Sequence, residues 1–130
     1  MDPRTRRHAL LLLAAGVVLG AGIWVFSPWM TGHVEPWDAD APIWQASWLL
    51  IAIAGGCTGH TRGLLLVVGY ALGQILITIN GVIRSEFGAL GWLFILGFMA
   101  AALVVTLTLV AAQALVMHYW RKLRSTDSGA

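Results

Sequence analysis

Charged residues are scarce in this sequence. Of its 130 residues only 11% are Asp, Glu, Lys or Arg, whereas 58% are hydrophobic and the mean hydropathy is +0.79. Such a chain has too little polar surface to cover an ordinary soluble domain, so lipid is the expected solvent for most of it. The single cysteine, Cys57, excludes an intrachain disulfide and is interpreted as a small packing residue among glycines.

The motifs of familiar catalytic chemistry are also missing. The sequence contains no nucleophile elbow, no HExxH pair, no P-loop, no haem-attachment CxxCH and no pair of intramembrane carboxylates. No ionisable Asp, Glu, Lys or Arg lies in the central part of any apolar segment, which argues against a proton relay or a proton-coupled carrier. We therefore expect no enzymatic activity and no cofactor.

Long apolar segments, in contrast, make up most of the chain. A helix needs about 20 residues to cross a hydrocarbon core of roughly 30 Å. Four segments reach or approach this length, namely residues 9–30, 43–57, 63–83 and 89–117, and they leave an outer loop, 31–42, and a tail, 118–130. The predicted fold is a single-domain, all-α integral membrane protein with a four-helix transmembrane bundle. Its short connections favour antiparallel packing of consecutive helices.

The distribution of basic residues predicts the orientation of these segments. With four spans, seven of the eight Lys and Arg residues fall on one side and only Arg84 falls on the other, as the positive-inside rule requires. Segment 43–57 is short and ends in glycines, but without it the basic C-terminal residues would lie outside. We expect both termini in the cytoplasm and a multi-pass location in a bacterial inner (plasma) membrane. Because the basic residues lie at helix ends, no nucleic-acid partner is expected.

The third apolar segment carries one face of small and polar residues on a helical wheel. Gln74 lies near the middle of the segment, with Tyr70, Thr78 and Gly81 on its side, and Gly73 belongs to a small-xxx-small pair. An amide that faced lipid at this depth would be costly, so the face must look into the bundle or into another subunit. It is interpreted as interhelical hydrogen bonding, as a partner surface, or as the lining of a polar path or small pocket.

The outer loop is the second candidate site. It brings together His33, Glu35, Trp37, Asp38 and Asp40 within eight residues. Oxygen-rich sets can hold a cation, but this spacing matches no EF-hand or zinc signature, so no metal site is assigned. An ordered loop on the tryptophan belt and a docking site for another protein are the alternatives, since exposed Trp and acidic residues suit protein interfaces.

These patterns predict a small, non-catalytic accessory or assembly subunit that binds another membrane protein. The alternative is a homo-oligomeric channel or facilitator for a small solute or ion, with Tyr70, Gln74 and Thr78 along an uncharged path. The expected partners are the lipid bilayer and either a second membrane protein or further copies of this chain.

Overall fold

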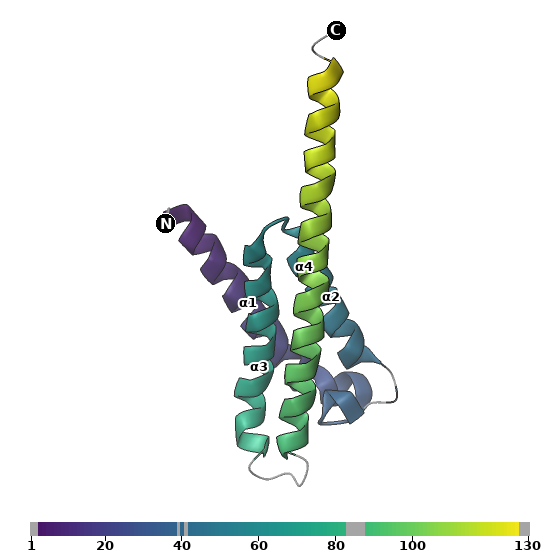
Figure 1. Cartoon of the computed structure of the whole chain (residues 1–130). Helices are drawn as coiled ribbons and strands as arrows, with labels where there is room; N and C mark the ends of the chain where they lie inside the picture. The colour runs from purple at the N-terminus through teal and green to yellow at the C-terminus, as the bar shows by residue number, and fades with distance from the viewer. Residues whose placement is uncertain (1–2, 39, 41, 83–87, 128–130) are drawn as a thin grey trace.

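The described chain is helical throughout. In the computed structural model, which describes residues 3–38, 40, 42–82 and 88–127, the elements are α1 (Pro3–Thr31), the short 3-10 helix η1 (Pro36–Asp38), α2 (Ile43–Cys57), the 3-10 helix η2 (Thr61–Gly63), α3 (Leu64–Val82) and α4 (Gly88–Asp127) (Figure 1). Three of these helices are long and apolar enough to cross a membrane, and α2 is a shorter apolar helix of 15 residues. The prediction of an all-helical chain with several apolar helices is confirmed.

The helix ends differ from the predicted segments at both termini. Helix α1 begins at Pro3 and includes the basic N-terminal residues, because nothing between Pro3 and Ala9 interrupts a helix and proline is tolerated in a first turn. Helix α4 has 40 residues, or about 60 Å at helical rise, and continues through most of the segment predicted as a tail. In Figure 1 its C-terminal half extends well beyond the other helices.

The closest helix pair is α1 with α3, and the two run parallel. Gly16 of α1 lies against α3 at Leu66 and Tyr70. Further along both helices, Gly73 of α3 lies against α1 at Val17 and Ala21. A Cβ at Gly16 or Gly73 would overlap backbone atoms of the other helix. Small residues therefore let the two backbones touch, as small-xxx-small pairs do in membrane helices.

A second parallel pair joins α2 and α4. The hydroxyl of Thr106 on α4 donates to the carbonyl of Ala52 on α2 over 3.0 Å, and further along both helices Gly56 lies against the side chain of Leu109. The main partners are thus next-but-one helices, whereas α1 and α2, consecutive in sequence, make few contacts with each other. Antiparallel packing of consecutive helices holds for α3 with α4 and, over a smaller contact, for α2 with α3.

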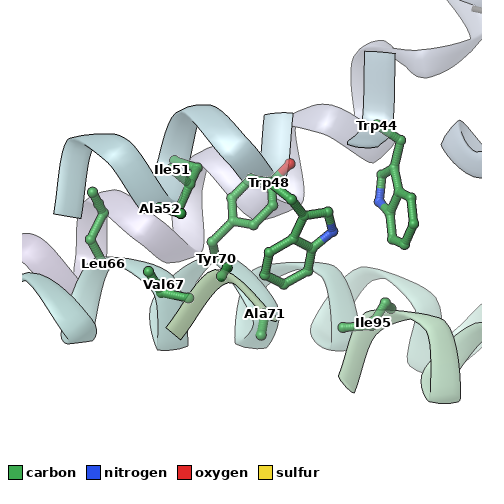
Figure 2. Packing of buried hydrophobic residues seen from close by; sticks show 10 residues of the cluster. Trp44, Trp48, Ile51, Ala52, Leu66, Val67, Tyr70, Ala71 and Ile95 are labelled. Atoms are coloured by element: carbon green, nitrogen blue, oxygen red, sulfur yellow. The ribbon is translucent and has the colours of Figure 1, made fainter. Parts of the chain in front are cut away.

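The core lies where α2, α3 and α4 meet, and aromatic residues dominate it. Trp44 and Trp48 of α2 and Tyr70 of α3 are almost completely buried, together with aliphatic residues from all three helices (Figure 2). The Trp48 and Tyr70 rings meet edge to face with centroids 4.8 Å apart, and Phe98 of α4 lies 4.7 Å from the Trp44 ring. Such aromatic pairs add to the free energy gained by burial alone.

Candidate functional site

Gln74 occupies the junction of three helices and is fully buried. Its Oε1 atom accepts a 2.7 Å hydrogen bond from Nε1 of Trp44 on α2 and a 3.3 Å bond from Nε1 of Trp24 on α1. One carbonyl oxygen can accept both bonds, because it has two lone pairs. The amide predicted to look into the bundle therefore links α1, α2 and α3 within one chain.

The other polar residues of the predicted helix-three face have the same role. The Tyr70 hydroxyl is hydrogen-bonded to the Ser47 hydroxyl on α2. Thr78 is buried, and its hydroxyl donates to the main-chain carbonyl of Gln74 over 2.9 Å. The same hydroxyl accepts a 3.3 Å bond from Nε1 of Trp92 on α4. Gly73 supports the contact with α1. Gly81 lies on α3, but outside the residues whose burial the structure describes. Four of the five predicted residues thus contact other helices of the same chain.

Two buried donors in this region have no partner among the described residues. They are Nε2 of Gln74 and Nε1 of Trp48. In an apolar interior an unpaired donor costs about 1–3 kcal/mol. The polar centre of the bundle is therefore not uniformly stabilising: the Gln74 oxygen contributes, while the nitrogen on the same amide does not.

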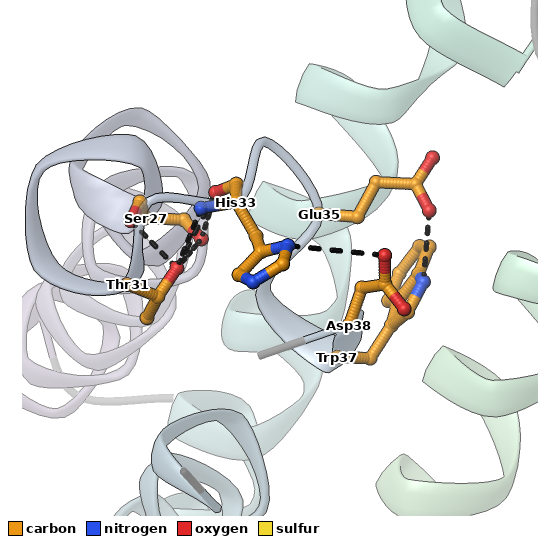
Figure 3. Close-up of polar contacts among 6 residues, drawn as sticks. All are labelled: Ser27, Thr31, His33, Glu35, Trp37 and Asp38. Carbon is orange, nitrogen blue, oxygen red and sulfur yellow. Dashed lines mark hydrogen bonds and ion pairs between the residues drawn. The ribbon is translucent and has the colours of Figure 1, made fainter. Parts of the chain in front are cut away.

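The outer loop is ordered by hydrogen bonds at the end of α1 (Figure 3). Gly32 has a φ of +76°, a value that glycine adopts without strain, and it reverses the chain after Thr31. The Ser27 hydroxyl then donates to the carbonyl of His33 over 2.8 Å, and the His33 amide donates to Oγ1 of Thr31 over 3.1 Å. These bonds hold the start of the loop against the last turns of α1.

Within this loop the predicted docking residues separate into two groups. Trp37 turns inward, where its ring meets that of Trp24 at 4.7 Å and its Nε1 donates to the Glu35 carboxylate over 3.0 Å. Asp38 and Asp40 are exposed, and the nearest pairing is His33 Nδ1 to Asp38 Oδ2 at 3.9 Å. Among the described residues no group of three or more His, Cys, Asp or Glu side chains is placed to hold a metal ion.

Sequence reasoning missed a groove between α1 and α2. It has a volume of about 500 Å³, and its lining is apolar apart from Ser47 and Tyr70. The lining residues are Val18, Leu19, Gly22, Ile23, Phe26 and Met30 of α1, Ser47, Leu50 and Ile51 of α2, and Tyr70 of α3. The groove exists because α1 packs on α3 and α2 packs on α4. No local pattern marks it, since the exposed face of any membrane helix is apolar.

Comparison with known proteins yields no relative. No protein family, no curated protein and no solved structure matches this chain.

Proposed function

We propose that the chain is a multi-pass inner-membrane protein with both termini in the cytoplasm, and that it acts as a non-catalytic accessory subunit. In this proposal α1, α2, α3 and α4 all cross the bilayer. The 15 residues of α2 extend only about 22 Å, and one face of this helix packs on α3 and α4 through Trp44 and Trp48. The groove between α1 and α2 receives a transmembrane helix of another membrane protein. No catalytic role is assigned to any residue.

The open groove is the observation that carries the proposal. Its walls contain large side chains that the chain itself leaves uncovered: Val18 is 70% exposed and Leu50 is 66% exposed. Among the described residues, no ionisable side chain other than Tyr70 lines it, and the Tyr70 hydroxyl is already bonded to Ser47. A complementary surface must therefore be apolar. Met30 and Phe26 near the groove's outer end suit an interface that adapts to its partner, because methionine repacks easily.

The channel alternative requires a different use of the same residues. Gln74 and Thr78 are engaged by indole donors of α1, α2 and α4, so a polar path along them would have to open those contacts. An uncharged path between copies of the chain is the remaining form of this alternative. It predicts that the purified protein alone carries ions or small solutes across liposomes.

Glycine 22 gives a direct test of the groove. A Cβ at Gly22 meets no atom within 4 Å, so Gly22→Leu should fold and fill part of the groove. Gly97 on α4 has the same open surroundings but lies outside the groove, which makes Gly97→Leu the matched control. We expect a stoichiometric partner to co-purify with the wild type and with Gly97→Leu but not with Gly22→Leu. Equal co-purification by both variants would refute the groove as the docking surface. The absence of any stoichiometric partner of the wild type, with flux through the protein alone, would refute the accessory role.

The lone cysteine tests the proposed orientation. Cys57 is exposed at the end of α2, on the side of the bundle assigned to the cytoplasm. A membrane-impermeant maleimide should label it in inverted vesicles and not in intact cells. The control is Asp40→Cys in a Cys57→Ser background, because Asp40 is exposed in the outer loop and should give the opposite pattern. Labelling of Cys57 in intact cells would contradict the orientation.

A further inference from the structure

The N-terminal part of α1 carries a pair of exposed positive charges. Arg6 and Arg7 are exposed and adjacent on α1. Among the side chains that the structure describes, neither guanidinium is within ion-pair distance of a carboxylate, and the one described pair, His33 with Asp38, belongs to the outer loop. Both guanidinium groups are therefore open to an anion from another molecule.

A hollow along the same helix combines these charges with apolar surface. It is lined by Pro3, Arg6, Arg7, Leu10, Leu11 and Ala14. This spacing places all six residues on one side of α1. The guanidinium groups lie at the N-terminal end and the leucines and Ala14 lie further along, with about 10 Å of helix between Arg7 and Ala14. The hollow is thus cationic at one end and apolar at the other.

This side of α1 is not used by the bundle. The close contacts of α1 with α3 involve Leu13, Gly16, Val17, Gly20 and Ala21. The groove between α1 and α2 is lined from Val18 onward. The hollow ends at Ala14 and shares no residue with either surface. The hollow is therefore a separate surface from the groove.

We propose that this part of α1 binds one anionic phospholipid, with the headgroup phosphate at Arg6 and Arg7 and an acyl chain along Leu10, Leu11 and Ala14. The inference rests on the proposed membrane insertion and cytoplasmic N-terminus. Arginine suits this role because its planar guanidinium donates two parallel hydrogen bonds to phosphate oxygens. An anionic lipid is favoured over a zwitterionic one because the latter carries its own cation beside the phosphate.

The test measures which lipids stay with the full-length protein. The protein is reconstituted in mixtures of phosphatidylglycerol and phosphatidylcholine, extracted gently and analysed by native mass spectrometry. Each basic residue near an anionic surface contributes about fivefold to affinity, so R6Q/R7Q should bind phosphatidylglycerol about 30-fold more weakly. The matched control is R121Q/R124Q, which removes two cations from α4 and should keep the bound lipid.

A second variant keeps every charge and separates this inference from the membrane topology. Ala14 is exposed at the apolar end of the hollow, and Ala14→Trp fills that end without touching the arginines. It should lose the lipid, whereas Ala100→Trp, at an exposed position on α4, should retain it. Maleimide labelling of Cys57 in each variant reports whether the orientation is intact, so a failed orientation and a failed lipid site are distinguished.

Three results would overturn the lipid site. The first is equal retention of phosphatidylcholine and phosphatidylglycerol by the wild type. The second is equal loss of lipid in R121Q/R124Q, which would indicate diffuse attraction between a basic protein and an acidic surface. The third is displacement of the lipid by millimolar inorganic phosphate, which would mean that the apolar end contributes nothing and that the arginines bind a free anion.

Discussion

Replacing Gln74 by leucine tests whether indole-to-amide hydrogen bonds hold the three helices together. The side chain accepts bonds from Trp44 and Trp24, at 2.7 and 3.3 Å, in a fully buried position. Interhelical hydrogen bonds in membrane proteins average about 0.6 kcal/mol and reach about 1.7 kcal/mol, so the two bonds together contribute about 1–2 kcal/mol. The variant loses both bonds and leaves the buried Trp44 donor and the partly buried Trp24 donor without this acceptor.

The amide nitrogen of Gln74 lowers stability in the wild type, so its removal partly offsets this loss. Nε2 of Gln74 has no partner among the described residues, so leucine removes one unpaired donor while it creates two. The balance is one additional unpaired donor, at a cost of about 1 kcal/mol or more, partly relieved when the indoles shift. We therefore expect Gln74→Leu to lower the free energy of unfolding by about 2 kcal/mol, or about 30-fold in the unfolding constant.

Reversible unfolding in mixed micelles, followed by tryptophan fluorescence, measures this difference. Gln45→Leu is the control, because Gln45 is exposed on α2 and should change stability by less than about 0.5 kcal/mol. A double-mutant cycle of Gln74→Leu with Trp44→Phe should give a coupling of about 0.6–1.7 kcal/mol. The reasoning is refuted if Gln74→Leu is as stable as the wild type and the coupling is below about 0.3 kcal/mol.

Three further predictions concern residues outside this hydrogen-bond network. Gly20→Ala should destabilise the α1–α3 pair strongly and Gly22→Ala should not, because a Cβ at Gly20 overlaps backbone and one at Gly22 meets nothing; thermal unfolding in detergent compares them. Thr106→Val should lower the free energy of unfolding by about 0.6–1 kcal/mol, because the bond to α2 is lost. Thr108→Val should change it little, because the Thr108 hydroxyl bonds to a carbonyl of α4 itself. Similar losses of stability in the two variants would contradict this. Gly59→Ala should lower stability by about 1–2 kcal/mol in denaturant titrations, because Gly59 has a φ of +65°; an unchanged midpoint would show that the turn relaxes.

The polar face of α3 shows how far the sequence could lead toward the candidate site. The depth of Gln74 in an apolar segment was enough to predict that it faces inward, because an amide in lipid is costly. Its partners were not predictable, since Trp24 and Trp44 are 50 and 30 residues away. An indole is equally well suited to a membrane interface. From their positions in the sequence, both tryptophans were therefore expected in the aromatic belt at the membrane surface.

For the outer loop, the sequence left more than one interpretation open. The loop was predicted either as an ordered loop on the tryptophan belt or as a docking site for another protein. The structure turns Trp37 onto Trp24 and leaves Asp38 and Asp40 exposed, and the docking role stays a prediction. The inward turn requires a flat surface, which Gly91 supplies where the Trp37 ring lies against it. A residue so distant carries no signal in the local pattern of the loop.

The sequence by itself determined that the chain forms apolar helices, because scarce charges and long hydrophobic segments are properties of composition and spacing. It also determined where the helices can approach closely, through glycines such as Gly16 and Gly73. Only the tertiary structure decided that α1 pairs with α3 and α2 with α4. That choice depends on which small surfaces meet across the bundle, and it is the physical reason why a groove remains between α1 and α2.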